Sequence, residues 1–436
     1  MDDMISGTTA AEIADSVRAL RERGMLRSGD PLPPVRELAS TLGVNRNTAV
    51  AAYRQLAQAG LVVSRGRAGT VIAGGAPVAQ EGVADTVLRD VASGNPDPAL
   101  IPDPTRALGS IVGRPVLYGE PVIDAGLERF TREWMRADLP RDDLQIVVTS
   151  GAVDAVERLL AQALTRDDAV ALEDPCFLAS IHTVRLGGYR AVPVPVDEEG
   201  MTVEGLRAAL HAGVRAIIST PRAQNPTGAS LSPARAEALR EVLADHPYVL
   251  IIEDDHFSLL SPHPYATLIG ADHERYALIR SVSKFLGPDM CVALAGTDPV
   301  TAERLAMRLS PGTTWVSHLL QRLAHAQLTD PDARAGIDRA AAHYASRNAA
   351  FRAALATRGI RTLSTDGLSL WVRLDVPARR AAEQLMRRGW LARPGDEFLL
   401  DDNAPPSQHL RLTVHDLTDA ETARLVDDLA AAAVRG

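Results

Sequence analysis

The sequence predicts an α/β protein with a small N-terminal domain of helices and two short strands, followed by a large domain with a mostly parallel central sheet. Three observations support this fold class. Residues 1–73 carry apolar residues at helical spacing and end in two strand-like runs. Residues 93–436 alternate apolar strand-like runs with helical segments, which is typical of a parallel sheet covered by helices. Residues 74–92 are rich in Gly, Ala and Val, so we interpret them as a linker.

Composition and charge exclude several classes of protein. With 436 residues, 46% of them hydrophobic and 23% charged, the chain has ordinary globular usage and the length of two or three domains. The net charge of -9 argues against a general nucleic-acid coat but allows a local basic patch. We find no signal peptide and no apolar span of bilayer length, so we expect a cytoplasmic protein. Cys176 and Cys291 have no metal-ligand spacing, which argues against a disulfide framework or a metal site.

The first domain follows the order of a winged helix-turn-helix. Apolar residues from Ile13 to Leu20 recur at helical spacing, and Gly24 ends that helix. Prolines then precede a short helix over 35–42, and Asn45 can cap a second helix over 46–59. Two short strands, residues 61–64 and 70–73, surround a basic turn. This order predicts a domain that binds double-stranded DNA.

Basic and polar side chains fall where such a domain contacts DNA. The first turn of the recognition-type helix enters the major groove, while the wing can reach phosphates or the minor groove. The domain has a formal excess of two positive charges in a chain that is otherwise acidic. A small helical domain with solvated arginines is the alternative. The predicted DNA-binding residues are Arg36, Arg46, Asn47, Thr48, Arg65, Arg67 and Gly69.

One residue in the large domain stands out by its type. Of 46 basic side chains, 45 are arginine and only Lys284 is lysine. A partly desolvated lysine amine can lose its proton and form a Schiff base with an aldehyde, which a guanidinium cannot do. Ser281 and Ser283, just before it, suit the phosphate of a cofactor. An incidental surface lysine would leave these neighbours unexplained, so we assign Lys284 a chemical role.

Other candidate residues follow strand-like runs at 146–148, 169–172, 216–218 and 249–252. Ligands of parallel sheets gather at the carboxyl ends of their strands. A Ser-Gly turn before a helix can hold a phosphate, although many ordinary turns have the same two residues. An aromatic residue after a strand belongs to the core more often than it stacks on a cofactor. Buried carboxylates are costly unless partnered, and one beside a pyridine nitrogen keeps that nitrogen protonated. The candidates in chain order are Ser150, Gly151, Ala152, Phe177, Asn225, Asp254 and His256.

Two segments of the first domain resemble the DNA-binding domain of GntR-type repressors. They are residues 33–39, PPVRELA, and residues 42–48, LGVNRNT. The Gly69-Thr70 pair after the basic wing fits the same family pattern. The resemblance covers nearly all of the domain and implies operator binding.

From about Ser93 to the C-terminus, the chain resembles the class I and II aminotransferases of fold type I, which bind pyridoxal 5'-phosphate (PLP). The resemblance implies a large domain with a mostly parallel sheet and a smaller C-terminal α+β subdomain. It also implies that Lys284 forms the Schiff base and that Asp254 pairs with the pyridinium nitrogen. Phe177 would stack on the ring, and Asn225 and His256 would approach its hydroxyl.

The resemblance further assigns the phosphate and an effector carboxylate. Arg411, in the segment LRLT, matches the arginine that binds a carboxylate of an amino acid. Tyr118 would reach the phosphate of the neighbouring subunit. The phosphate of the same subunit would be surrounded by Ser150, Gly151, Ala152, Ser281 and Ser283.

A GntR-type domain followed by such a large domain is the arrangement of the MocR family, which the chain resembles over essentially its whole length. This implies a homodimer that responds to PLP, or to an amine or amino acid, through aldimine exchange at Lys284. Two residues depart from the family pattern. His256 stands where tyrosine is common, and Cys291 stands where an arginine contacts the phosphate. Loss of that charge-assisted contact predicts weaker cofactor retention unless another arginine compensates.

Three functions are consistent with the sequence. The first is a ligand-responsive transcriptional regulator in which exchange at Lys284 alters the spacing or orientation of two DNA-binding domains. The second is a PLP-dependent aminotransferase with a DNA-binding domain, because the same residues serve binding and proton transfer. The third is a DNA-binding regulator whose large domain has lost PLP, which Cys291 favours.

Overall fold

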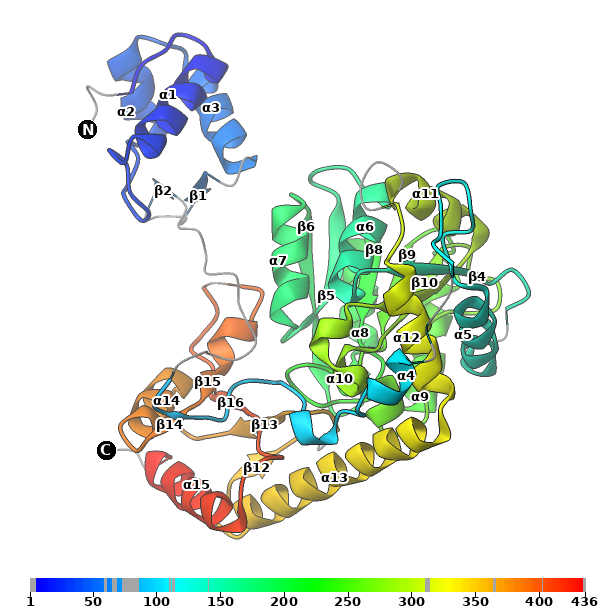
Figure 1. Ribbon diagram of the computed structural model, residues 1–436. Coiled ribbons are helices and arrows are strands. Elements are labelled where there is room, and N and C mark those ends of the chain that lie inside the picture. Colours follow the sequence, from blue (N-terminus) through cyan, green and yellow to red (C-terminus); the bar gives the residue numbers. More distant parts are fainter. Residues whose placement is uncertain are drawn as a thin grey trace. The chain divides into compact units, whose positions relative to one another are not determined.

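The computed structural model describes residues 5–58, 61–64, 69–72, 86–109, 111, 114–139, 141–309, 314–363, 366–401 and 403–433. The chain divides into two compact units, Met1–Gln80 and Glu81–Gly436 (Figure 1). Within the described part of the chain, no helix is both long enough and apolar enough to cross a membrane.

The N-terminal unit has the predicted order of three helices and two strands. These are α1 (Ala10–Glu22), α2 (Val35–Leu42), α3 (Arg46–Gln58), β1 (Val62–Ser64) and β2 (Thr70–Ile72), with β1 and β2 antiparallel. Thr9 and Glu12 form a capping box on α1, and Gly43 ends α2 in the left-handed conformation. The core includes the buried side chains Ile13, Val17, Leu20, Leu38, Leu56 and Ile72. Arg65 and Arg67 of the predicted wing lie outside the described residues.

The C-terminal unit is built on an eight-stranded sheet with the order β4-β11-β10-β9-β8-β5-β6-β7. Strands β6, β5, β8, β9 and β10 are parallel, whereas β11 is antiparallel to both of its neighbours. The mostly parallel sheet is therefore confirmed. The strands are β4 (Gln145–Thr149), β5 (Ala169–Asp174), β6 (Arg190–Asp197), β7 (Gly200–Met201), β8 (Val214–Ser219), β9 (Leu250–Asp254), β10 (Tyr276–Ser281) and β11 (Ala293–Thr297).

Helices cover both faces of this sheet, because successive strand residues point to opposite sides. Val147 and Ile218 pack in a cluster with α6, α7 and α11, while Ile146 and Ile217 pack in a second cluster with α5, α8, α9 and α12. The helices of this unit up to the sheet's end are α4 (Thr105–Leu108), α5 (Ala125–Asp138), α6 (Ala152–Ala163), α7 (Leu178–Leu186), α8 (Val203–His211), α9 (Pro233–Leu243), α10 (Ser283–Leu286), α11 (Pro299–Leu309) and α12 (His318–Thr329).

A smaller α+β subdomain completes the C-terminal unit. The long helix α13 (Pro331–Ala356) runs to it from the large sheet (Figure 1). Its antiparallel sheet has the order β12-β13-β16-β15 and packs on α14 (Ala378–Met386) and α15 (Asp419–Ala432). The strands are β12 (Arg361–Thr362), β13 (Leu370–Arg373), β15 (Arg393–Pro394) and β16 (His409–Leu412).

The last part of the expected linker belongs to this subdomain. Within residues 74–92, residues 74–85 lie outside the described part of the chain. β3 (Arg89–Asp90) pairs in parallel with β14 (Trp390–Leu391), and Val91 is fully buried among the apolar residues of the subdomain. The C-terminal unit therefore includes part of the segment whose composition is that of a linker.

Candidate functional site

The carboxyl ends of the parallel strands meet around one cavity of about 270 Å³. A loop or helix start after each of β4, β5, β8, β9 and β10 contributes to its wall, as expected for a sheet of this kind. Every predicted cofactor residue except Tyr118 lines it, together with Val153 and Cys291. The predicted residues are Ser150, Gly151, Ala152, Phe177, Asn225, Asp254, His256, Ser281, Ser283 and Lys284.

Asp254 is the acidic residue of this cavity. Its Oδ1 is buried and has no hydrogen-bond partner in the described structure, and His256 Nδ1 lies 3.8 Å from it. Burial raises the pKa of this carboxyl group, while the charges of His256 and Lys284 act in the opposite direction. A buried carboxylate in this state is stabilised by a ligand that brings it a proton donor or a positive charge.

The start of α6 forms another part of the wall. Gly151 caps this helix with φ of 103°, a backbone angle that favours glycine, and its neighbours Ser150 and Ala152 also line the cavity. Ser281 Oγ donates a hydrogen bond of 3.0 Å to Ser283 Oγ on a different part of the wall. Hydroxyl groups and the N-terminus of a helix thus share one cavity, which is an arrangement that suits an anion.

Cys291 lies in the wall at the position where an arginine was expected. It is exposed, has a left-handed backbone with φ of 46°, and its Sγ lies 3.4 Å from the carbonyl oxygen of Pro288. Within the described part of the chain, no arginine lines the cavity. The described residues of this chain therefore offer no compensating guanidinium at the cavity.

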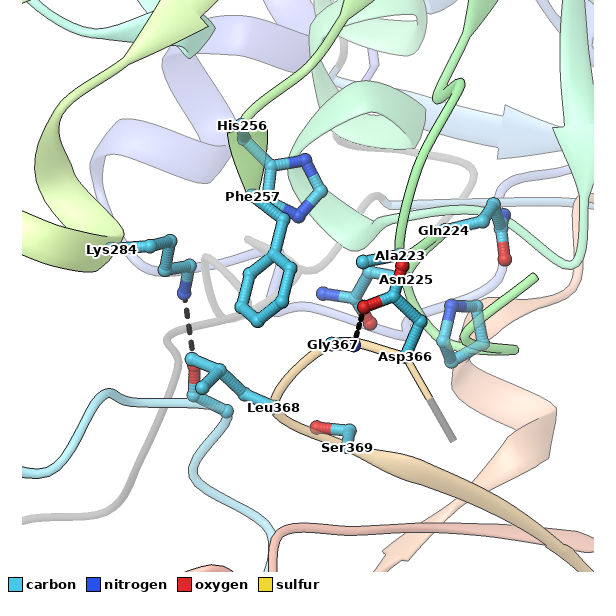
Figure 2. A pocket seen from close by; sticks show the side chains of 12 residues that line it. Ala223, Gln224, Asn225, His256, Phe257, Lys284, Asp366, Gly367, Leu368 and Ser369 are labelled. Carbon is cyan, nitrogen blue, oxygen red and sulfur yellow. Dashed lines mark hydrogen bonds between the residues drawn. The ribbon is translucent and has the colours of Figure 1, made fainter. Parts of the chain in front are cut away.

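Lys284, at the start of α10, lies between the cavity and a second, much smaller space of about 20 Å³. Its amine donates a hydrogen bond of 2.9 Å to the carbonyl oxygen of Gly94, the dashed line from Lys284 in Figure 2. Gly94 lines the small space but not the larger cavity. Sequence reasoning missed this contact, because a backbone carbonyl leaves no signature in the sequence.

Arg411 on β16 is fully buried and is connected to the cavity through Asn225. Its Nη1 donates to Asn225 Oδ1 at 3.2 Å, and its Nη2 donates to the carbonyl oxygen of Ala92. The guanidinium also lies over the ring of Phe398, 5.1 Å from its centroid. The structure thus joins two residues that the sequence separates by more than 180 positions.

Tyr118 does not join the cavity of its own chain. It is 87% exposed, and its ring packs against that of Trp315 with 5.2 Å between the centroids. Both rings line a separate hollow of about 720 Å³ that also includes Arg114 and Arg322. The expected role of Tyr118 in a neighbouring subunit stays a prediction.

The predicted DNA-contacting residues of the described N-terminal unit lie at its surface. Arg36 on α2 and Arg46 and Asn47 at the start of α3 are exposed, and Thr48 is half-buried. Asn45 caps α3 as predicted, because the amide of Asn47 donates to its Oδ1 at 2.8 Å. Gly69 is also exposed and has φ of 87°. The first turn of α3 therefore presents polar side chains to solvent.

Both parts of the chain match known families. Residues 9–72 match the bacterial regulatory proteins of the gntR family, and residues 113–429 match aminotransferase class I and II. The solved structures show the same fold for the C-terminal unit. A kynurenine aminotransferase from Pyrococcus horikoshii, in complex with PMP, is 20% identical with a TM-score of 0.71, covering 80% of this chain and 91% of that one. LysN from Thermus thermophilus is 23% identical with a TM-score of 0.69, covering 80% and 92%.

Two relatives are named as transcriptional regulators. The vitamin B6 salvage pathway transcriptional repressor PtsJ of Salmonella typhimurium is 46% identical over 98% of this chain and 99% of its own length. The pyridoxine biosynthesis regulator PdxR of Corynebacterium glutamicum is 29% identical over 57% of this chain and 56% of its own. A GntR-type head followed by an aminotransferase-like domain defines a class of DNA-binding transcriptional regulators. This chain belongs to that class, and within it to the MocR family.

Proposed function

We propose that this protein is a transcriptional repressor that responds to PLP bound at Lys284. The observation that carries the proposal is that a lysine amine and a buried carboxylate, Asp254, lie on one cavity whose wall also holds hydroxyls and a helix N-terminus. The 46% identical relative is named as a repressor of vitamin B6 salvage, which supports the same ligand class and sign of regulation.

The residues of the cavity fit PLP. Its aldehyde can accept the Lys284 amine, and its ring withdraws electrons when the pyridine nitrogen is protonated. Asp254 would hold that nitrogen in its protonated form, since its Oδ1 is buried and has no hydrogen-bond partner in the described structure. Phe177 would stack on the ring, and Asn225 and His256 would contact its hydroxyl. The phosphate would be held by Ser150, Gly151, Ala152, Ser281 and Ser283.

An amine or amino acid effector and a dimer complete the proposal. Arg411 would bind a carboxylate next to Asn225, from which it is separated by 3.2 Å. The exposed Tyr118 would reach the phosphate of the second subunit of a homodimer. Two DNA-binding units would then contact two half-sites, and a change in the C-terminal units would alter their spacing.

The first test concerns cofactor binding. Titration of PLP into the full-length protein is expected to give the absorbance of a lysine adduct, and mass spectrometry after borohydride reduction is expected to place it on Lys284. Lys284→Ala removes the amine and is expected to abolish both signals. An unmodified Lys284 after treatment with excess PLP would favour the regulator that has lost its cofactor.

The second test concerns DNA. Binding to the region upstream of the protein's own gene is expected to depend on salt and on PLP. Arg46→Ala is expected to weaken binding by about 10-fold, in keeping with a side chain at the groove. Arg18→Ala, on the exposed side of α1, serves as the control. Equal binding by both variants would contradict the role of α3.

An aminotransferase is the second candidate function. The arrangement of Lys284, Asp254 and Asn225 on one cavity favours it, with Arg411 of the smaller sheet bonded to Asn225, because these groups serve the amino-acid substrate as well as the cofactor. Incubation of the PLP-loaded protein with an amino donor and a keto acid tests it. Multiple turnovers of keto product per protein would favour an enzyme, and at most one would favour a regulator.

A further inference from the structure

The segment Val91 to Asn95 is fastened to the ligand-binding residues by hydrogen bonds, and we call it the strap. It directly follows β3, and the segment that joins the two units precedes it in the chain. Val91, Ala92 and Gly94 are buried, although Val91 and Ala92 fall within the segment whose composition is that of a linker. The strap therefore lies next to β3, which pairs with β14 in the same unit.

One attachment of the strap comes from α10, the helix that follows β10 of the large sheet. The amine of Lys284 donates to the carbonyl oxygen of Gly94 at 2.9 Å. Gly94 has φ of 63°, a conformation that glycine adopts at little cost, and it lines the small space next to Lys284. The proposed reactive group is thus engaged with the strap in this structure.

The other attachments come from the C-terminal subdomain. Arg411 Nη2 donates to the carbonyl oxygen of Ala92, and the amide of Thr413 donates to that of Val91 at 2.7 Å. Thr413 Oγ1 accepts from the amide of Gly94 at 2.9 Å, and His415 Nε2 donates to the backbone carbonyl oxygen of Asn95 at 3.0 Å. The strap therefore bridges the two parts of the unit, and the Lys284 bond is its link to α10.

We propose that PLP regulates DNA binding by releasing the strap from Lys284. The proposal rests on the proposed function. The neutral amine adds to the aldehyde carbon, its two hydrogens leave with the aldehyde oxygen as water, and a carbon–nitrogen double bond remains. The nitrogen then carries at most one hydrogen and is held in the larger cavity, which Gly94 does not line. The strap keeps its bonds to the subdomain but loses the bond to α10.

Hydrogen–deuterium exchange of the full-length protein tests the release directly. PLP is expected to speed exchange of the amides in residues 91–97 by about 2- to 10-fold, the effect of one lost hydrogen bond on a local opening equilibrium. Lys284→Ala without PLP is expected to exchange as fast as the loaded wild type, and PLP is expected to change it no further. Equal exchange of the free and loaded wild type would overturn the proposal.

A second pair of variants tests the consequence for DNA. Thr413→Val removes the acceptor for the Gly94 amide, whereas Thr422→Val removes a threonine acceptor of the same subdomain that contacts Arg347 instead. Thr413→Val is expected to form the lysine adduct normally but to lose most of the PLP effect on DNA affinity, and Thr422→Val is expected to behave as wild type. A full PLP response in Thr413→Val would count against the strap.

The outcomes separate the two proposals. If the wild type forms no adduct on Lys284, or if PLP leaves its DNA affinity unchanged, the proposed function fails and the strap mechanism fails with it. If the adduct and the DNA response are both present while exchange of residues 91–97 is unaltered, only the strap mechanism fails.

Discussion

At the scale of single residues, Glu253, Asp254 and Asp255 are consecutive carboxylates in different surroundings. Glu253 accepts from Tyr265, Thr267 and the amide of Leu268. Asp255 accepts from Arg222 and Arg280 at distances of 2.6 to 3.0 Å. Side chains alternate along a strand, so Asp254 points away from these partners and into the cavity. Because Glu253 and Asp255 already have protein partners, Asp254 is the carboxylate of the three that is available to a ligand.

The effect of Cys291 on cofactor affinity is testable. Cys291→Arg would place a guanidinium at the cavity and is expected to tighten PLP binding by about 10- to 100-fold, the effect of one hydrogen bond to a charged group. Absorbance titration measures the affinity. Cys291→Ser changes the thiol without adding charge and is expected to bind as wild type. PLP binding by the arginine variant no tighter than by the serine variant would contradict this expectation.

Glu173 at the end of β5 predicts a pH effect on stability. Burial raises its pKa to about 7, although Thr220 and Ser219 donate hydrogen bonds to it. Between its ordinary pKa of 4.5 and about 7, the folded state binds more protons than the unfolded state, so the free energy of unfolding falls as pH rises. The free energy of unfolding should fall by an amount on the order of 3 kcal/mol across this range, and Glu173→Gln is expected to abolish that fall. Urea unfolding of both proteins at about pH 5 and pH 8 measures it, and equal pH dependence would refute the assignment.

At the scale of elements, polar caps stabilise the first turns of two helices in the N-terminal unit. Thr9 caps α1, and Asn45 caps α3, whose first turn carries Arg46 and Asn47. The cap of α3 was predicted from sequence, as a polar residue before an apolar periodic segment, whereas the cap of α1 was found only in the structure. Tyr53 OH donates to the carbonyl oxygen of Pro33 at 2.6 Å, which connects α3 to the chain before α2.

The two caps provide a matched pair of substitutions. Asn45→Ala and Thr9→Ala are each expected to lower the free energy of unfolding of the N-terminal unit by about 1 kcal/mol, the usual cost of losing a cap. Only Asn45→Ala also removes the constraint on the turn that carries Arg46, so it alone is expected to weaken DNA binding under conditions where both variants are folded. Thermal unfolding and DNA titration measure the two effects. Equal loss of DNA binding in both variants would show that the effect is stability alone.

At the scale of the whole molecule, the chain consists of two units with separate cores. The apolar cluster around Ile13 and Leu56 belongs to the N-terminal unit, while the clusters on both faces of the large sheet belong to the C-terminal unit. The cavity and Lys284 lie entirely in the second unit. Ligand binding therefore stabilises the folded state of that unit directly.

Calorimetry of the full-length protein tests this division. We expect two unfolding transitions, of which only the one of the C-terminal unit shifts with PLP. At a PLP concentration of about 100 times Kd, the stabilisation is about 2.7 kcal/mol, which raises that transition by a few degrees. Asn45→Ala is expected to lower only the other transition, which assigns the two. A single transition, or equal shifts of both, would show that the units unfold together.

The sequence by itself determined the fold class, the element order of the first domain and most of the cavity wall. Helical spacing and strand runs are local patterns, and parallel strands bring their carboxyl ends together, so residues from Ser150 to Lys284 could be placed on one edge. The strands extend one or two residues beyond several predicted ends, and Asp254 thus lies within β9 rather than after it. These differences left the predicted wall unchanged.

Only the tertiary structure decided the pairings that join distant segments. The antiparallel position of β11, the pairing of β3 with β14, and the contacts of Lys284 and Arg411 with the strap all depend on backbone groups brought together by the fold. Every residue except proline has the same backbone N–H and C=O, so such contacts leave no pattern in the side chains. The lysine could be found from sequence because it is chemically unique in this chain, whereas its partner Gly94 could be found only from where the chain passes in space.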